Sequence, residues 1–242
     1  DYDGLISIHE RTFNRSMGLC VSNDQLWLSG LYQLWRFQNF LEPEQLSEGY
    51  DALYVPVVGH TTGDIDIHDI HVRKDNTPIF VATRFNCLAT LGSRYSFEPL
   101  WRPPFIDRIA AEDRYHLNGM ATENDEPRYV SCVAKSNIAE GWRDHRDNGG
   151  LILDVKTNET IASGLSMPHS PRLYKGRLWI LQAGNGEFGY IDLETGMFEA
   201  ICFLPGFARG LSFISDYAVI GLSKPRHNKT FNGLQLNERL QS

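Results

Sequence analysis

The 242-residue chain has no run of apolar residues long enough to cross a bilayer. It has no excess of positive charge either, because 23 Lys and Arg stand against 30 Asp and Glu, and this balance disfavours non-specific binding to nucleic acid. No signal-peptide pattern is visible, since Asp1 leads directly into strand-like sequence. We therefore expect a protein that binds neither a membrane nor nucleic acid.

Cysteine is scarce, and the few residues present do not pair in sequence. None of them forms the C-x-x-C spacing of zinc knuckles and thioredoxin-like motifs. Each lies in an apolar, strand-like context, which favours small buried side chains. This usage is typical of a reducing compartment, so we expect a cytoplasmic protein. The four residues are Cys20, Cys87, Cys132 and Cys202.

Signatures of several enzyme classes are missing. No G-x-S-x-G, Walker A or H-E-x-x-H string occurs. The string GNGEFG at 184–189 matches the dinucleotide-binding pattern, but it leads into another strand-like segment, where that site needs a helix N-terminus. We interpret it as a glycine-rich hairpin.

Helical periodicity is almost absent, and short β-rich runs bounded by turn residues dominate. Five of these runs follow a similar segment that contains a polar residue, glycine or proline; we call these the opening segments. They are residues 16–21, 67–72, 117–121, 169–173 and 208–213, with anchors at Gly18, Asp69, Gly119, Pro171 and Gly210. The anchors are 51, 50, 52 and 39 residues apart. Four-stranded propeller blades repeat at about 40–50 residues, so we predict an all-β protein, a β-propeller with five recognisable blades.

The two ends of the chain fit the same repeat. Residues 4–15 resemble residues 196–209, so the chain begins with the outer strand of one blade and ends after the first two strands of another. Residues 1–242 then form a single domain that lacks parts of its terminal blades, and we expect six blades in the full-length protein. The alternative is that the two ends share one blade and close the ring.

Several long strings occur in order along the chain. They are TRFNCLATL (83–91), WRPPFI (101–106), HLNGMA (116–121), GGLILDV (149–155), GLSMPHSPR (164–172), LPGFARGLSF (204–213) and VIGLSK (219–224). Together they resemble a mainly bacterial family of conserved hypothetical proteins of unknown function, some of whose members carry tetratricopeptide repeats. The resemblance covers essentially the whole chain and implies a propeller-like fold. It implies no reaction and no catalytic residues.

The opening segments of a propeller begin beside its central channel, so their polar residues are candidates for one shared site. Although they are distant in sequence, they would bring imidazole, amide and guanidinium groups near a common axis. The candidate ligand-binding residues here are His68, Asp69, His116, Asn118, His169, Ser170, Arg172 and Arg209. The alternative is that they hydrogen-bond neighbouring blades and hold the ring together.

A second group of candidates follows the second strand of three blades. These ligand-binding candidates are Arg84, Asn185 and Lys224. If their loops surround the channel mouth, the rim is cationic and suits a phosphate, a carboxylate or an acidic sugar. A solvated basic rim is the alternative.

No cofactor is expected, although a divalent metal is left open. His68 and His71 would point to opposite faces of a strand. Asn118 and Asp69 suit calcium, but the arginines and histidines of the other opening segments do not.

One polar excursion, residues 140–146, interrupts a blade and contains Trp142. Long loops on a rigid scaffold often carry binding residues. Arg143, His145 and Arg146 either cover the channel mouth or belong to a solvated insertion.

Three functions remain open. The first is binding of a small anionic or carbohydrate-like molecule. The second is a hydrolase or lyase in which His68, His116 or His169 is the general base, and Arg172 or Arg209 stabilises developing negative charge. The third is a scaffold for a protein partner, with structural channel residues. The sequence assigns no catalytic residue among these.

Overall fold

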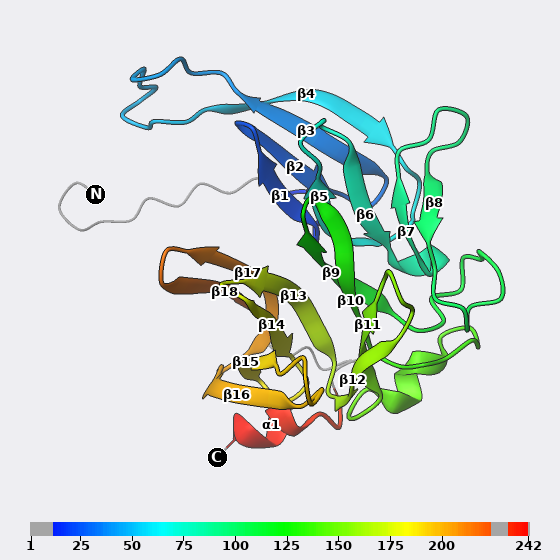
Figure 1. Cartoon of the computed structure of the whole chain (residues 1–242). Coiled ribbons are helices and arrows are strands. Elements are labelled where there is room, and N and C mark those ends of the chain that lie inside the picture. The colour runs from blue at the N-terminus through cyan, green and yellow to red at the C-terminus, as the bar shows by residue number, and fades with distance from the viewer. Residues whose placement is uncertain (1–11, 224–231, 242) are drawn as a thin grey trace.

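The computed structural model describes residues 12–223 and 232–241. Four of its sheets have four antiparallel strands each, and a fifth sheet has two. The sheets follow one another around a common centre (Figure 1). The predicted all-β propeller with five recognisable blades is thereby confirmed.

Each of the first four blades consists of four consecutive strands. Blade 1 contains β1 (Leu19–Ser22), β2 (Gln25–Ser29), β3 (Gln33–Asn39) and β4 (Tyr54–Thr61). Blade 2 contains β5 (Ile67–Val72), β6 (Pro78–Ala82), β7 (Cys87–Thr90) and β8 (Glu98–Trp101). Blade 3 contains β9 (Leu117–Glu123), β10 (Glu126–Cys132), β11 (Gly150–Asp154) and β12 (Thr160–Leu165). Blade 4 contains β13 (Pro168–Tyr174), β14 (Arg177–Gln182), β15 (Glu187–Ile191) and β16 (Phe198–Phe203).

Blade 5 is represented by β17 (Phe207–Ile214) and β18 (Tyr217–Ser223). The described helices are short: η1 (Thr83–Phe85), η2 (Gly141–His145) and α1 (Gln235–Arg239). None of them is long and apolar enough to span a membrane. The alternative of a shared blade depends on residues 1–11 and 224–231, which lie outside the described residues. It stays a prediction, as does the sixth blade expected of the full-length protein.

Tight turns join the first two strands of the blades, as the turn residues predicted. Asn23 and Asp24 have φ of 49° and 57° between β1 and β2, and Lys175 and Gly176 have φ of 47° and 75° between β13 and β14. Two consecutive positive φ angles match the right-handed twist of the flanking strands.

The first strand of each blade is the innermost, because neighbouring first strands pack together around the channel.

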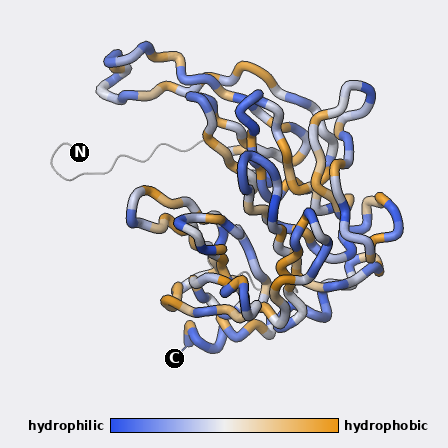
Figure 2. The backbone as a smooth tube through the Cα atoms, in the orientation of Figure 1, coloured by the Kyte–Doolittle hydropathy of each residue, from blue (hydrophilic) through white to orange (hydrophobic). Residues whose placement is uncertain are grey.

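Apolar side chains fill the spaces between the blades. Figure 2 shows hydrophobic residues along many strands and hydrophilic residues at many loop tips. Between blades 2 and 3, for example, Ile79 and Val81 of β6 pack with Leu117 of β9 and Val130 of β10. All of these are fully buried. Such contacts fix the relative positions of the inner strands and hence of their polar side chains.

The cysteines fit this core only in part. All four are free thiols, and Cys87 and Cys132 are buried as expected. Burial raises the pKa of the Cys87 thiol to about 12, which leaves it uncharged and inert. Cys20 is partly buried, but Cys202 is exposed, so the expectation of burial is wrong for Cys202. Cys202 lies on β16, the outermost strand of its blade, in which every residue after Phe198 is exposed.

An ion pair between Asp69 and Arg172 ties three blades together. Arg172 of β13 donates from Nη1 to Asp69 Oδ2 at 2.8 Å and from Nη2 to Asp69 Oδ1 at 3.0 Å. The same Nη1 reaches the carbonyl of Met120 on β9 at 2.9 Å. Asp69 of β5 also accepts the backbone N–H groups of Ile70 and Met120. We call this arrangement the interblade clamp.

We predict that Arg172→Met destabilises the fold by about 3–5 kcal/mol, because it leaves the buried Asp69 carboxylate without its cation. The matched control is Arg73→Met, which breaks an exposed pair with Glu126 and should change stability by less than about 1 kcal/mol. Urea unfolding at pH 7 measures both. An equal effect of the two substitutions would contradict the structural role of the clamp.

Candidate functional site

Three imidazoles and one guanidinium from four blades gather at the channel. His68 lies on β5, His116 immediately precedes β9, His169 lies on β13 and Arg209 lies on β17. The rings of His68 and His116 meet edge to face, with centroids 4.9 Å apart. Arg209 also reaches Met17 of the first opening segment, with 3.6 Å between Nη1 and Sδ. The prediction that distant opening segments meet at one place therefore agrees with the structure for these residues.

Irregular backbone accompanies each of these positions. The register of the ladder shifts between Ile67 and Ile70, Ser131 and Cys132, His169 and Arg172, and Arg209 and Leu211. Bulges of this kind bend a strand and redirect its side chains, and they are common beside functional sites. His116 has a φ of 51°, a conformation that a non-glycine residue adopts only when its surroundings enforce it.

Hydrogen bonds on one edge of the ring hold His68. Its Nδ1 lies 2.7 Å from Thr83 Oγ1 and 3.1 Å from the carbonyl of Asp66. The Thr83 hydroxyl itself donates to the carbonyl of Leu117 at 2.5 Å. With its proton directed there, the hydroxyl can only accept from His68, so the ring proton lies on Nδ1.

The other two imidazoles are held in the same way. His116 Nδ1 lies 2.8 Å from Asp113 Oδ2, and His169 Nδ1 lies 2.8 Å from the carbonyl of Met167. Both partners are acceptors, so the proton again lies on Nδ1. Nε2 of His169 is buried and has no hydrogen-bond partner among the described residues.

Burial keeps two of these rings neutral. Burial, followed by the neighbouring His116, lowers the pKa of His68 to about 4, and Arg209 acts in the same direction. Burial also holds the pKa of His169 well below its ordinary value, with a further contribution from the charge of Arg209. At neutral pH both side chains are therefore uncharged.

Asp113 and Trp142 complete the surroundings of His116. The indole stacks on the imidazole with centroids 4.1 Å apart, and its Nε1–H donates to Asp113 Oδ2 at 3.0 Å. Burial alone would raise the pKa of Asp113, but His116 and the hydrogen bonds outweigh it and hold this pKa below its usual value. The polar excursion thus inserts its aromatic residue beside the channel histidine. The sequence offered one signal for Asp113, its position three residues before His116, and our reasoning missed it.

The remaining opening-segment candidates make contacts inside the protein. Asp69 and Arg172 form the interblade clamp. Ser131 donates to Asn118 Oδ1 at 2.7 Å, and Ser170 Oγ accepts the N–H of Gly210 at 3.0 Å. The contacts of Asp69, Arg172 and Ser170 join neighbouring blades and fit the interblade alternative, whereas the Asn118 contact lies within blade 3. No observation tests a role in ligand binding.

Two of the candidates predicted at the channel rim, Arg84 and Asn185, contact other residues of the protein. Arg84 in η1 pairs with Asp64, and its side chain is 44% exposed. The carbonyl of Asn185 accepts a hydrogen bond from Arg239 of α1 at 3.0 Å, so the C-terminal helix contacts the turn between β14 and β15. That turn is the predicted glycine-rich hairpin. Lys224 lies outside the described residues.

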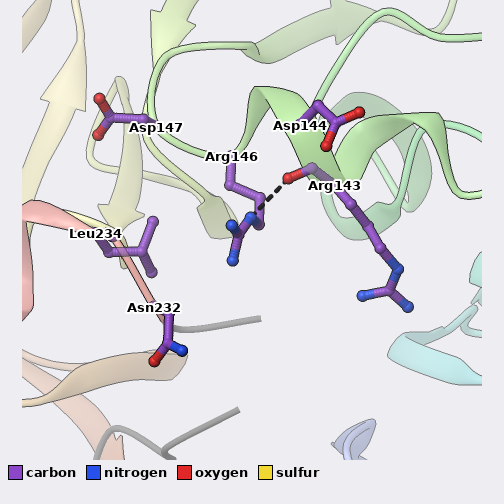
Figure 3. Close-up of a pocket in the computed structure, with 7 residues that line it drawn as sticks. Arg143, Asp144, Arg146, Asp147, Asn232 and Leu234 are labelled. Atoms are coloured by element: carbon purple, nitrogen blue, oxygen red, sulfur yellow. Dashed lines mark hydrogen bonds between the residues drawn. The ribbon is translucent and has the colours of Figure 1, made fainter. Parts of the chain in front are cut away.

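A pocket of about 240 Å³ lies between η2 and the C-terminal segment. Figure 3 shows Arg146 of this pocket, whose Nε donates to the carbonyl of Arg143 at 2.6 Å. Its lining is charged with both signs: Arg143, Asp144, Arg146, Asp147, Asn232, Gly233 and Leu234. Arg143 also lies 4.5 Å from the Trp142 ring, so the excursion contributes to both the pocket and the histidine cluster.

Within residues 12–223 and 232–241, no group of three or more His, Cys, Asp or Glu side chains is arranged to hold a metal ion. The two candidates that suit calcium are engaged elsewhere, because Asn118 Oδ1 accepts from Ser131 and Asp69 binds Arg172. The absence of a cofactor stays a prediction.

The profile of a family described as "Domain of unknown function (DUF4915)" matches residues 1–242, so the chain belongs to that family. This confirms the expected membership of a family of unknown function. No curated protein matches the chain.

Among solved structures, a gluconolactonase-like protein is similar to this chain with a TM-score of 0.55, 12% identity, and coverage of 82% of this chain and 68% of that one. A streptogramin B lyase gives a TM-score of 0.44, 15% identity, and coverage of 82% and 59%. A virginiamycin B lyase from Staphylococcus aureus with quinupristin has a TM-score of 0.45 and 11% identity, with coverage of 86% of this chain and 62% of that one. The chain thus spans 59% and 62% of the two lyases. At 12% identity, the similarity to the gluconolactonase-like protein shows the fold alone.

We predict that the free energy of unfolding falls as the pH drops from about 7 to 5. The unfolded chain takes up protons on His68 and His169 near their ordinary pKa of 6.5, whereas the folded chain does not. The stabilisation is thus present above that pKa and lost below it, and His68 alone accounts for about 2 kcal/mol at pH 5. Urea unfolding across this range should show a shallower pH slope for His68→Gln. A slope for His68→Gln equal to that of the wild type would refute the assignment.

Proposed function

We propose that the channel of this propeller binds a small anionic or carbohydrate-like molecule. The observation that carries the proposal is the gathering of His68, His116, His169 and Arg209 from four blades. Convergent polar groups in a concave region are the usual signature of a binding site. The family is of unknown function, so the proposal rests on these residues.

Hydrogen bonding separates this cluster from residues that only join blades. Asp69 accepts four hydrogen bonds within the protein, which uses the whole capacity of a carboxylate. Each of the three histidines is bonded through one nitrogen only, in the part of the chain that the structure describes. Residues that serve as interblade contacts would have no reason to leave the second nitrogen of each ring uncommitted.

Charge favours an anion among the small molecules. Arg209 is the permanent cation of the cluster, since burial keeps His68 and His169 neutral. A carboxylate or phosphate would form charge-assisted hydrogen bonds with Arg209. The scaffold alternative has no comparable support, although a protein partner stays a prediction.

A thermal-shift panel of small anions and sugars tests the proposal. At about 100 times its Kd, a ligand should raise Tm by roughly 5–10 °C. The shift should disappear in His169→Ala and Arg209→Ala, provided that both variants still unfold cooperatively. Arg94→Ala, an exposed arginine in the β7–β8 loop, is the control and should keep the shift. A panel without any shift, or variants that respond like the wild type, would contradict the proposal.

A second candidate function is a hydrolase or lyase, and the pair of Asp113 and His116 favours it. Asp113 fixes the proton on Nδ1 and would stabilise the imidazolium that forms when Nε2 takes a proton. The proton would come from water in a hydrolase or from carbon in a lyase. Arg209 would stabilise the negative charge that develops on the substrate. The fold shared with a gluconolactonase-like protein agrees with this candidate only as an analogy of fold.

Turnover of lactone and ester substrates distinguishes the enzyme from the binder. If His116 is the base, His116→Gln and Asp113→Asn should each lower kcat by about 10²–10⁴. The chain offers a matched control in His71 and Asp125, a histidine–carboxylate pair outside the channel with 2.9 Å between Nε2 and Oδ1. His71→Gln should leave kcat unchanged. Equal activity of all these variants would rule out His116 as the base.

A further inference from the structure

We infer that residues 40–53, the connection between β3 and β4 of blade 1, form a docking arm for a protein partner. The contact surface of that partner combines apolar side chains with lysine or arginine. The inference is independent of the ligand proposed for the channel. It follows from the length of the arm, its exposed apolar side chains and its unbalanced negative charge.

The arm is much longer than the blade repeat requires. The corresponding connections between third and fourth strands are residues 91–97 in blade 2, 155–159 in blade 3 and 192–197 in blade 4. In blades 3 and 4 a single aspartate closes the turn, since Asp154 and Asp192 each accept two backbone N–H groups. A short turn therefore suffices to join these strands. Long connections on a rigid scaffold often carry binding residues instead.

The arm extends away from the blades (Figure 1) and is held by backbone hydrogen bonds. At its base the N–H of Phe40 donates to the carbonyl of Leu53 at 2.8 Å, so these two residues lie opposite one another. Near its tip, Ser47 and Tyr50 exchange two backbone hydrogen bonds of 3.0 and 2.9 Å. A segment that is ordered before binding loses little conformational entropy when a partner docks.

Large apolar side chains of the arm face solvent, and the patch continues onto β4. Phe40 is 69% exposed and Leu46 is 63% exposed. Single exposed apolar residues are normal on a protein surface, whereas several on one hairpin are typical of an interaction site. The exposed apolar residues are Phe40, Leu46, Tyr50 and Leu53 in the arm, followed by Tyr54 and Val57 of β4.

The charge of the arm is negative and unbalanced. No lysine or arginine occurs between Arg36 and Arg73. The charged residues of the arm are all acidic and exposed: Glu42, Glu44, Glu48 and Asp51. None of these carboxylates forms an ion pair with another residue that the structure describes. Lysine or arginine on a partner would therefore meet carboxylates that are not already paired.

The sign of this charge favours one class of partner. Nucleic acids and the anionic surface of a membrane carry the same sign as the arm and would be repelled. A second copy that docked arm to arm would bring the two sets of carboxylates together, on a chain whose net charge is −7. A protein surface with basic residues around an apolar centre matches both properties of the arm, because charge steers the encounter and apolar contacts hold the complex.

Fluorescence anisotropy with three labelled twelve-residue peptides tests this class of partner. The first peptide alternates lysine with leucine and phenylalanine, the second has glutamate in place of lysine, and the third has serine in place of the apolar residues. We expect the 242-residue chain to bind the first peptide at least about tenfold more tightly than either of the others at low salt. The affinity should fall as the salt concentration rises.

Variants assign the binding to the arm. Phe40→Ser combined with Leu46→Ser should weaken binding of the first peptide by at least about tenfold, because it removes the most exposed apolar side chains of the arm. The matched control combines Tyr95→Ser with Ile214→Ser, which are 65% and 64% exposed on other blades, and it should leave the affinity unchanged. Replacement of residues 40–53 by the turn sequence of residues 193–196 should abolish binding.

Three results would overturn the inference. They are no binding of the first peptide, binding of either other peptide with equal affinity, and an affinity in the Phe40 and Leu46 variant equal to that of the wild type. The point variants decide the question even if the chain with the replaced arm does not fold. None of these results bears on the channel ligand, since the substituted residues lie outside the histidine cluster.

Discussion

The hydrogen bond from Nδ1 of each channel histidine to an acceptor on the protein fixes what the rest of the site can do. It sets the orientation of each ring, and in the neutral His68 and His169 it leaves the opposite nitrogen as a hydrogen-bond acceptor. His68 and His169 share one type of anchor, the backbone carbonyl two residues before the ring, and Thr83 also contacts His68. His116 is anchored by the Asp113 carboxylate.

The channel divides its polar residues between two tasks. Asp69 and Arg172 satisfy one another and the surrounding backbone, and in doing so they connect blades 2, 3 and 4. The histidines are satisfied on one edge only. The positive φ of His116 stores backbone strain, and such strain persists only where the surrounding structure enforces it. The clamp and the apolar contacts between the blades provide that support.

Much of the fold could be predicted from the sequence, because a blade is a repeated local pattern. Turn residues such as Asn23 and Asp24 and the opening segments mark where the strands begin, and their spacing reveals the blades. The meeting of His68, His116, His169 and Arg209 followed from that repeat alone. The assignment of ligand-binding roles within the repeat was less secure, because spacing places a residue on a strand but does not reveal the bulge that turns its side chain. Asp69 and Arg172 therefore looked like channel groups and proved to bind one another.

Residues outside the repeat were harder to predict. Asp113 precedes an opening segment, Thr83 directly follows the second strand of blade 2, and Trp142 belongs to the excursion, so none of them lies in an opening segment. Their contacts with His68 and His116 depend on loops whose paths the sequence does not specify. The Nδ1 anchors of two histidines were invisible for this reason, and so was the chemistry that follows from them.

The most direct test of the account is the position of the ring protons in the free protein. Nitrogen-15 NMR of the histidine side chains at pH 7 separates the two neutral tautomers and the imidazolium. The account predicts the proton on Nδ1 and a lone pair on Nε2 for both His68 and His169. A proton on Nε2 of either ring, or a charged ring at that pH, would contradict it.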